Sequence, residues 1–473
     1  MDINVPMPSS PPKEVFWFLS PLLTSLGFLL ALVLLARMLR TQRSPSSTIA
    51  WLLIILLLPY VGVPLYLMFG GRKMRIRAGR KEPVYHFRRI SRETSGIGPA
   101  ERVLQSYGVP PATPGNRIQA LTSGEEAYRH LINLIDNAKT SIHITTYVLG
   151  MDDVAQAIIT RLAGRAREGV EVRLLLDSVG SWRLRRYFLA PLYESKAEVA
   201  FFMPVLHTPF RGRANLRNHR KIVVVDGREA LTGGMNLAEE YMGPTPNPKR
   251  WRDFSLAISG PAVADLAELF RSDWKFTTGK SVTIDATPAP PIEGETTVAQ
   301  VVASGPDVAG DPLFESLVSL MFTATSRIWV VTPYFVPDET LAKALDLAAR
   351  RGVDVRLIMP EHSNHLMADL ARASYIRELH SSGGHVMLFE PVMLHAKVVL
   401  IDNHVAIVGS ANMDMRSLFL NYEVALFLTS RGDIEETTAW VESIMAESHT
   451  ELPVGGRFRA LAEDVVRLLS PLL

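Results

Sequence analysis

The sequence predicts an α/β protein built as two tandem α/β/α repeats with pseudo-twofold symmetry, preceded by an N-terminal transmembrane helical hairpin. Three observations predict this architecture: a segment that recurs far along the chain, strands that alternate with helices in each half, and two long uncharged runs near the N-terminus. A chain of 473 residues also exceeds the size of one ordinary core, so several domains are expected.

The composition is that of a folded protein with room for a membrane segment. Hydrophobic residues make up 47% of the chain and charged residues 21%, which excludes a disordered protein. The net charge of +2 gives no global basic field of the kind that nucleic-acid-binding proteins show, although it leaves room for a local basic groove. The absence of cysteine excludes disulfides, a thiol nucleophile and cysteine-ligated metal.

Residues 1–71 are predicted to form the membrane hairpin, with helices at about 15–36 and 49–69. Neither run contains a charged residue, and the first is long enough to cross the hydrocarbon core. Pro59, Gly62 and Pro64 interrupt the second run, which therefore either spans with a kink, is re-entrant or lies partly in the interface. A cleaved signal peptide is disfavoured because Asp2 and Glu14 precede the first run in place of a basic segment.

Residues 72–116 are predicted to be a basic juxtamembrane linker. Residues 72–81 carry six positive charges, whereas the segment between the two hydrophobic runs carries three, Arg37, Arg40 and Arg43. The positive-inside rule therefore places the remaining chain in the cytoplasm as part of a multi-pass protein. Contact of these bases with anionic lipid headgroups is the alternative, and it leads to the same placement.

The remaining chain is duplicated. Residues 166–176 (AREGVEVRLLL) reappear as residues 349–359 (ARRGVDVRLIM), and each copy has the pattern of a helix end, a glycine and a buried strand. We therefore predict a first repeat over residues 117–285 and a second over residues 286–473. The Pro-rich residues 286–291 have the stiffness of a linker between them.

Each repeat carries the same chemical motif. The first copy consists of His219, Lys221, Asp226, Gly233, Gly234 and Asn236, and the second of His395, Lys397, Asp402, Gly409, Ser410 and Asn412. From average residue usage, such a match arises by chance on the order of 10⁻⁸ per starting position. Two occurrences therefore indicate a shared function.

The spacing has a physical meaning. Histidine and lysine two positions apart on a β-strand project from the same face, so both can reach one ligand. Asp226-Gly227 and Asp402-Asn403 favour tight turns, which predicts that each motif is a hairpin that returns its glycines and asparagine toward the histidine. Glycine lets backbone N–H groups approach an anion, and the asparagine amide adds a donor.

This residue set predicts an anion site without a metal. Lysine is not a metal ligand, and no carboxylate stands at a ligand spacing from either histidine. Imidazole can attack or protonate, and paired lysines suit a phosphoryl group whose oxygens gain charge in the transition state.

On these residues the chain resembles the phospholipase D superfamily and, within it, the bacterial cardiolipin synthases. The resemblance covers nearly the whole chain, including the hydrophobic N-terminal pair followed by Gly70, Gly71 and Arg72. Further matching segments are residues 332–338 (TPYFVPD), 409–414 (GSANMD) and 467–471 (RLLSP). Gly234 departs from the pattern of Ser410, so a hydroxyl contact to phosphate is expected on one side only.

The resemblance implies one active site between the two halves and a phosphatidyl-histidine intermediate. His219 is assigned as nucleophile and His395 as general acid, with the reverse assignment left open. The resemblance further implies that Lys221, Lys397, Asn236, Ser410 and Asn412 bind the phosphoryl oxygens, that Asp253 and Glu423 orient the histidines, and that Asp226 and Asp402, although part of the motif, secure the hairpins.

For a cardiolipin synthase, the resemblance implies transfer from one phosphatidylglycerol to another, giving cardiolipin and glycerol in the bacterial inner membrane. No cofactor, metal or nucleic acid is expected to take part, and the partners are anionic phospholipids and the bilayer. The alternatives are phosphatidylethanolamine as acceptor, a hydrolytic phospholipase D, a phosphatidylserine synthase, a nuclease, or a scaffold that has lost catalysis. The sequence does not indicate the oligomeric state.

Overall fold

The chain forms two compact units in a computed structural model. The structure describes residues 33, 45–58, 60, 62–63, 66, 81–86, 98–204, 216–282, 289–452 and 463. The first unit comprises Met1–Arg72 with Leu472, and the second comprises Lys73–Pro471 with Leu473.

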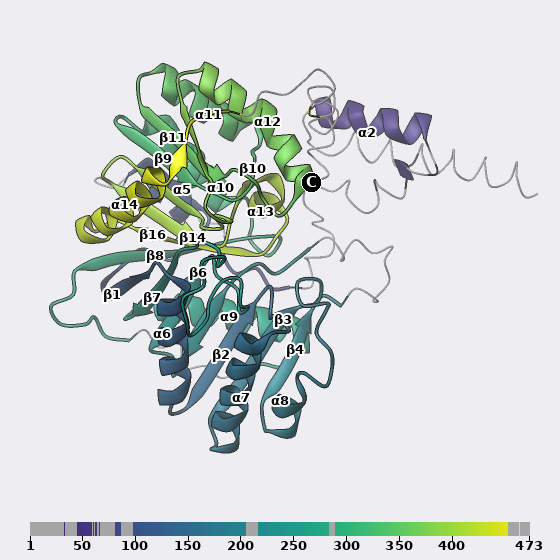
Figure 1. Ribbon diagram of the computed structural model, residues 1–473, viewed down its shortest axis with the longest axis vertical. Helices are drawn as coiled ribbons and strands as arrows, with labels where there is room; N and C mark the ends of the chain where they lie inside the picture. The colour runs from purple at the N-terminus through teal and green to yellow at the C-terminus, as the bar shows by residue number, and fades with distance from the viewer. Residues whose placement is uncertain are drawn as a thin grey trace, which may run out of the picture. The chain divides into compact units, whose positions relative to one another are not determined.

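In the first unit the described element is helix α2 (Pro45–Leu57), shown in purple in Figure 1. It begins before the predicted start at residue 49 and ends ahead of Pro59, whose ring is incompatible with a preceding helical turn. Apart from Val33, the predicted helix over residues 15–36 lies outside the described residues. None of the helices among the described residues combines the length and apolar character needed to cross a membrane.

The second unit is organised around one fifteen-stranded sheet. Its first half contains β1 (Thr113–Leu121), β2 (Ser141–Thr146), β3 (Glu171–Asp177), β4 (Glu198–Phe202), β5 (Ile222–Val225), β6 (Glu229–Gly233) and β7 (Ser255–Ser259). Its second half contains β8 (Thr297–Ser304), β9 (Arg327–Val331), β11 (Asp354–Pro360), β12 (His385–Phe389), β13 (Val398–Ile401), β14 (Val405–Gly409), β16 (Glu423–Leu428) and the edge strand β17 (Ser448–His449). A separate parallel pair joins β10 (Phe335–Val336) to β15 (Met413–Asp414).

The strand order shows the pseudo-twofold symmetry. The order β4-β3-β2-β5-β6-β7-β1 in the first half corresponds to β12-β11-β9-β13-β14-β16-β8 in the second. The halves join where β1 and β8 pair antiparallel, with Thr113 opposite Ala299. This confirms the predicted duplicated α/β fold. Strand β1 begins ahead of residue 117, the predicted start of the first repeat.

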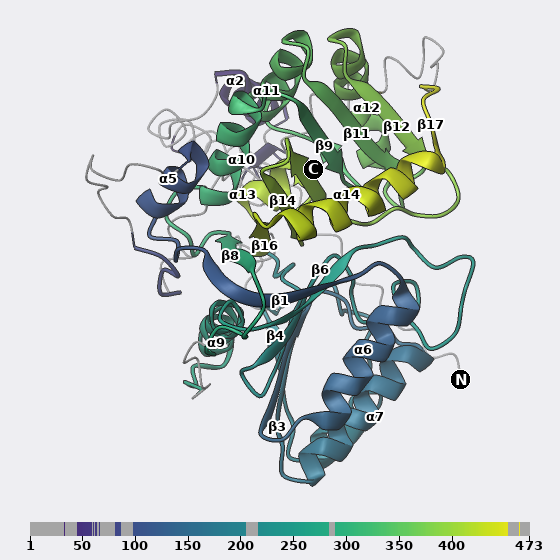
Figure 2. The ribbon, with the colours of Figure 1, turned by 90° about the vertical axis from the view of Figure 1, so that its left-hand side faces the viewer.

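Helices cover both faces of each half-sheet, as Figure 2 shows. In the first half, α6 (Gly124–Asn137), α7 (Asp153–Arg167) and α8 (Ala190–Glu194) lie on one face and α9 (Val263–Thr278) on the other. The second half has α10 (Pro312–Thr323), α11 (Glu339–Arg350), α12 (Leu366–Ser381), α13 (Met415–Phe419) and α14 (Arg431–Ala446). Helix α5 (Pro99–Ser106), which falls within the predicted linker, packs against α10.

Several helices start where the sequence supplies a cap. The side chains of Ser123, Asp152 and Asp338 accept hydrogen bonds from the backbone N–H groups of Glu126, Ala155 and Thr340, respectively. Each cap satisfies one of the N–H groups that a helix leaves unpaired in its first turn.

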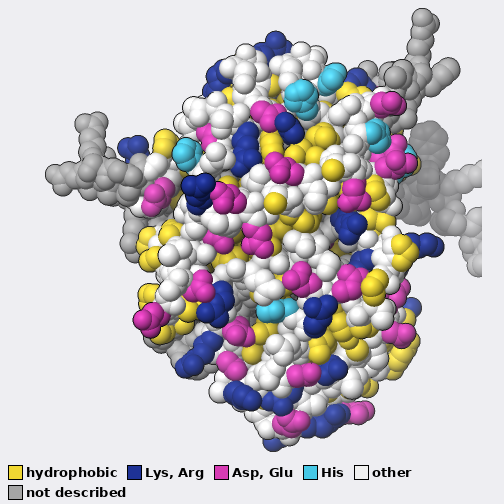
Figure 3. All heavy atoms as spheres, turned by 60° about the vertical axis from the view of Figure 1, so that its left-hand side comes forward, with side chains coloured by type: hydrophobic (Ala, Val, Ile, Leu, Met, Phe, Trp, Pro, Cys, Tyr) yellow, Lys and Arg dark blue, Asp and Glu magenta, His cyan; other side chains and the backbone are white. Residues whose placement is uncertain are grey.

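The surface carries no strongly basic face in the view of Figure 3, where Lys and Arg side chains are interspersed with Asp and Glu. This mixture agrees with the small net charge of the chain.

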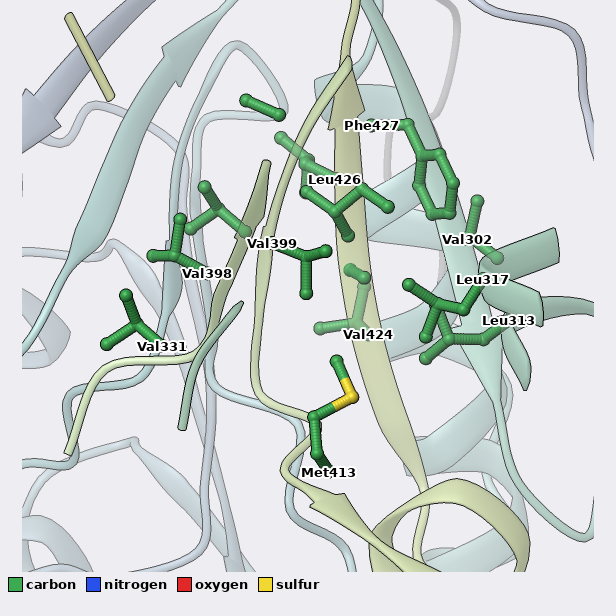
Figure 4. Close-up of a cluster of buried hydrophobic side chains, with 14 of the residues drawn as sticks. Val302, Leu313, Leu317, Val331, Val398, Val399, Met413, Val424, Leu426 and Phe427 are labelled. Carbon is green, nitrogen blue, oxygen red and sulfur yellow. The ribbon is translucent and has the colours of Figure 1, made fainter. Parts of the chain in front are cut away.

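The core extends to both faces of the central strands. All four residues of β5 are buried, with Ile222 and Val224 in one hydrophobic cluster and Val223 and Val225 in the other. Figure 4 shows part of the larger cluster, where Leu313 and Leu317 of α10 lie beside β8 and β16. Strands buried on both faces fix the register, because a one-residue slip would exchange the two packed faces.

Candidate active site

Both His-x-Lys pairs lie in extended segments immediately before a strand, not within the strand as the sequence suggested. His219 and Lys221 precede β5, and His395 and Lys397 precede β13. The reason is that each segment bonds across the halves: His219 N–H donates to the Tyr422 carbonyl at 2.9 Å, and His395 N–H donates to the Arg252 carbonyl at 2.7 Å.

One cavity of about 520 Å³ opens between the halves at this point. Its lining includes seven residues predicted from the two motifs, namely His219, Lys221, Asn236, His395, Lys397, Ser410 and Asn412. Residues from two segments far apart in the sequence thus share a single site.

His395 is held by a carboxylate from the other half. Asp253 Oδ2 lies 2.7 Å from His395 Nδ1, and the Asp253 side chain is fully buried. Burial alone would raise the pKa of Asp253, but the charges of His395 and Lys397 hold that pKa below its usual value. An ionised Asp253 therefore orients the ring and leaves Nε2 for chemistry.

His219 has the equivalent partner, again from the other half, but at a longer distance. Glu423 Oε1 lies 3.5 Å from His219 Nδ1. Burial raises the pKa of Glu423 to about 8. The two histidines therefore contact carboxylates that differ in pKa: the pKa of Asp253 is lowered and that of Glu423 is raised.

Ser410 is hydrogen-bonded to this second carboxylate, Glu423. Its hydroxyl, which is predicted to contact phosphate, donates to Glu423 Oε2 at 2.5 Å and accepts from the Val424 N–H at 3.0 Å. At the equivalent position of the first motif, a Cβ on Gly234 would lie 2.0 Å from Asp253 Oδ1. Glycine is required there because the Asp253 carboxylate fills the space of a side chain.

The site lowers the pKa of its histidines and lysines. Burial, followed by the positive charges of Lys221, Arg416 and Lys397, lowers the pKa of His219 well below its ordinary value. Burial and Lys397 lower the pKa of His395 to about 4. A bound phosphodiester anion would offset the repulsion from these positive charges, so the site favours binding of such a group.

The two lysines are positioned by their own motif. Lys221 Nζ donates to the His219 carbonyl at 2.8 Å, and Lys397 Nζ lies 3.1 Å from His395 Nε2. Burial lowers the pKa of Lys221 and brings that of Lys397 to about 7. A ligand with negative oxygens would stabilise both ammonium groups.

The amides of Asn236 and Asn412 are fixed by neighbours. Asn236 Oδ1 accepts from the Val148 N–H at 3.2 Å, and Asn412 Nδ2 donates to Ser417 Oγ at 3.1 Å. Both side chains are nearly fully buried at the cavity wall. Their orientation is therefore set before a ligand arrives.

Asp226 and Asp402 lie at the opposite ends of their strands from the histidines. Asp226 accepts from the N–H groups of Lys139, Thr140 and Ser141 at 2.7–2.9 Å. Asp402 accepts from the N–H groups of Thr325, Ser326 and Arg327 at 2.7–3.2 Å. Both aspartates adopt positive φ, 54° and 50°, at the turn of the predicted hairpin. They tie each hairpin to a neighbouring strand.

Aromatic side chains enclose the histidines. The Tyr147 ring centroid lies 3.9 Å from that of His219, and Tyr241 and Trp251 lie 5.1 and 5.4 Å from that of His395. The sequence patterns missed Tyr241 and Trp251 as neighbours of a predicted catalytic histidine. The only sequence signal for Trp251 was its position two residues before Asp253.

Behind the first motif lies a buried ionic network. Arg220 Nη1 donates to Asp273 at 2.7 Å and Arg220 Nη2 to Asp307 at 3.3 Å, and all three side chains are fully buried. Lys81 donates to the same two carboxylates, to Asp307 at 2.7 Å. Lys81 belongs to the stretch predicted as a linker, so the network joins that stretch and both halves behind the His219 segment.

The segment with Glu361, His362 and His365 does not form a metal cluster. His365 is the N-cap residue of α12 and lines the cavity, and His362 Nε2 is 4.0 Å from Glu361 Oε1. Among the described residues, no group of three or more His, Asp or Glu side chains is arranged to hold a metal ion.

Comparison with known proteins agrees with this geometry. The family model described as "Cardiolipin synthase, PLD-like domain" matches residues 131–274 and 317–445, so each match contains one motif. A second model, described as "Phospholipase D-nuclease N-terminal", matches residues 29–71.

Individual relatives align over almost the full length. The chain is 34% identical to Cardiolipin synthase 1 of Bacillus cereus and 35% identical to the cardiolipin synthase of Geobacillus kaustophilus, covering 91% of this chain and 90% of each relative. Its fold is similar to the crystal structure of phosphatidylserine synthase from Haemophilus influenzae. That match has a TM-score of 0.60 and 16% identity, and covers 80% of this chain and 100% of the other. The chain therefore belongs to the cardiolipin synthase family of phospholipase D-like enzymes.

Proposed function

We propose that this chain is a phosphatidyltransferase that makes cardiolipin from two molecules of phosphatidylglycerol, with glycerol as the second product. The observation that carries the proposal is the single cavity lined by both His-x-Lys pairs. The names of its relatives support the product, and the lysines suit a substrate that carries a phosphodiester.

In the first step, His219 Nε2 attacks phosphorus and the bond from phosphorus to the glycerol oxygen breaks. His395 donates its proton to that departing oxygen. Lys221 and Lys397, with the amides of Asn236 and Asn412, stabilise the charge that develops on the phosphoryl oxygens. The result is a phosphatidyl-histidine and free glycerol.

In the second step, His395 accepts a proton from a glycerol hydroxyl of the second phosphatidylglycerol. The resulting oxygen attacks phosphorus, and the bond between phosphorus and His219 breaks. One phosphodiester is exchanged for another, so the reaction requires no ATP. Asp253 and Glu423 act as positioning residues that fix the ring nitrogens.

The carboxylates support His219 as nucleophile and His395 as acid. A nucleophilic imidazole must be neutral; burial and the neighbouring cations lower the pKa of His219, and its partner Glu423 itself favours the protonated form. The acid must carry a proton, and Asp253 at 2.7 Å stabilises an imidazolium at His395.

We also propose that residues 15–36 and 49–69 anchor the enzyme in the bacterial inner membrane, with the second unit in the cytoplasm. The uncharged runs and the six positive charges in residues 72–81 support this topology. The absence of cysteine makes it testable with a single engineered cysteine, such as Lys249→Cys in an exposed loop. Labelling by a membrane-impermeant thiol reagent should occur in inverted vesicles and not in intact spheroplasts; the reverse pattern would refute it.

The catalytic proposal is tested by incubating the purified full-length protein with phosphatidylglycerol vesicles in the presence of a chelator. Cardiolipin and glycerol should form in equal amounts. Phosphatidic acid as the sole lipid product would identify a hydrolase instead, and adding phosphatidylethanolamine reveals whether it serves as the acceptor. Loss of activity with the chelator would refute a metal-free mechanism.

A further inference from the structure

We propose that two exposed loops at the mouth of the cavity form a docking rim for an anionic bilayer surface. The rim consists of residues 180–187, which follow β3, and residues 361–367, which follow β11 and include the first two residues of α12. The inference rests on the proposed function because it explains how a lipid substrate reaches the cavity. It concerns the second unit alone and does not depend on the hairpin.

The rim exposes large apolar side chains to solvent. Trp182 and Tyr187 in the first loop are 69% and 70% exposed, and Leu366 and Met367 in the second are 73% and 43% exposed. Trp and Tyr favour the boundary between water and lipid because their rings are apolar while one edge is polar. Exposed apolar residues clustered around an opening are typical of a docking surface.

Both loops are attached to the wall of the cavity. Val179, immediately before the first loop, lines the cavity, and Ser181 Oγ donates to the carbonyl of the lining residue Tyr147 at 3.1 Å. In the second loop, His365 and Met367 line the cavity directly. Because β3 and β11 are symmetry counterparts in the sheet, the loops that follow them contribute to the same opening from the two halves.

The positive charge of the first loop favours binding to an anionic surface. Arg183, Arg185 and Arg186 are exposed between Trp182 and Tyr187, and residues 178–193 contain no acidic residue. Three positive charges within six residues contrast with a net charge of +2 for the whole chain. Arginine next to interfacial aromatic residues is suited to lipid phosphates, and the attraction is confined to the membrane surface.

The experiment compares two substrates. In the first assay, the full-length protein acts on a bilayer in mixed phosphatidylglycerol and phosphatidylethanolamine vesicles. In the second, the same protein acts on short-chain phosphatidylglycerol below its critical micelle concentration, where the lipid is dissolved as monomers. Trp182→Ala with Tyr187→Ala, and separately Arg183→Gln with Arg185→Gln and Arg186→Gln, should lower the rate on the bilayer at least about tenfold. The rate on monomers should remain unchanged.

Control variants remove matched side chains elsewhere. Phe322→Ala removes an exposed aromatic ring from the end of α10, and Arg228→Gln removes an exposed charge from the β5–β6 turn, at the opposite end of β5 from Lys221. Both controls should retain the bilayer rate. Equal losses on both substrates, or no loss on either, would overturn the docking rim.

A direct measurement separates this inference from the catalytic one. With brominated phosphatidylglycerol in the vesicles, the difference in fluorescence between the wild-type chain and Trp182→Phe isolates one of the seven tryptophans. Its emission should be quenched. Unquenched Trp182 emission would refute docking and leave the rim as a surface for a protein partner. Absence of lipid exchange in the wild type, with Trp182 quenched, would refute the proposed function alone.

Discussion

Asp253 Oδ2 lies 2.7 Å from His395 Nδ1, although the two residues come from different halves of the molecule. The reciprocal pair, Glu423 and His219, crosses the halves in the other direction at 3.5 Å. Each half therefore contributes the histidine of one pair and the carboxylate of the other. An isolated half would contain neither pair complete.

Asp253→Asn is expected to lower kcat by about 10²–10⁴, because an amide at this position neither stabilises an imidazolium nor enforces the same tautomer. Glu423→Gln should cost less, since burial already favours the protonated form of Glu423, which glutamine imitates. Initial rates of lipid exchange measure both. Asp265→Asn, which alters a half-buried carboxylate on α9, is the control. A larger loss for Glu423→Gln than for Asp253→Asn would contradict the asymmetry.

His219→Ala and His395→Ala should both abolish turnover on phosphatidylglycerol, yet differ on a phosphatidyl ester of p-nitrophenol. This leaving group departs without a proton donor, so His395→Ala should release one equivalent of nitrophenol per enzyme and stop at the covalent intermediate. His219→Ala should give no burst, because it lacks the nucleophile. Rapid-mixing absorbance measures the burst, and a burst from His219→Ala alone would reverse the two roles.

Asp402→Ala is expected to lower the free energy of unfolding by about 1–3 kcal/mol, because three backbone N–H groups lose their acceptor. Burial alone would raise the pKa of Asp402, but these hydrogen bonds lower that pKa to about 2. The stabilisation is therefore fully present above the unfolded-state value near pH 4 and is lost as the pH falls toward 2.

Denaturant titrations across this pH range measure that difference between the wild type and Asp402→Ala. The gap should narrow as the pH falls from about 5 to about 2. Asp136→Asn on the exposed face of α6 should show little change. A gap independent of pH would argue against the ionised carboxylate as the stabilising group.

Arg220→Met should destabilise the second unit by about 3–5 kcal/mol, since it leaves Asp273 and Asp307 buried with one cation in place of two. Lys81→Met should act in the same direction. Unfolding of the full-length protein in detergent, followed by circular dichroism, tests both. Lys275→Met removes a lysine from an exposed pair with Glu82 and should have little effect. Wild-type stability for Arg220→Met would show that the network is dispensable.

The local features of each motif could be predicted from the sequence, whereas several of its contacts with surrounding residues could not. The His and Lys pairs, the turns at Asp226 and Asp402 and the duplicated strands follow from local spacing, because strand periodicity and turn preference act over a few residues. The hydrogen bond from Ser410 to Glu423 was not predicted, because Glu423 approaches from a neighbouring strand. Nor could local patterns show that Lys81 is buried, since its partners lie far along the chain.

The sequence by itself determined the family, the two copies of the motif and the residues able to carry phosphoryl chemistry. The reason is that an uncommon set of residues at fixed spacing can be recognised without knowing the fold. Only the tertiary structure decided that the carboxylates cross between halves, that Ser410 supports Glu423, and that two exposed loops flank one cavity. The physical reason is that each relationship joins separate segments: Asp253 with His395 and Glu423 with His219 across the halves, and Ser410 with Glu423 between neighbouring strands of the second half. Such contacts depend on how separate segments pack, which no local pattern encodes.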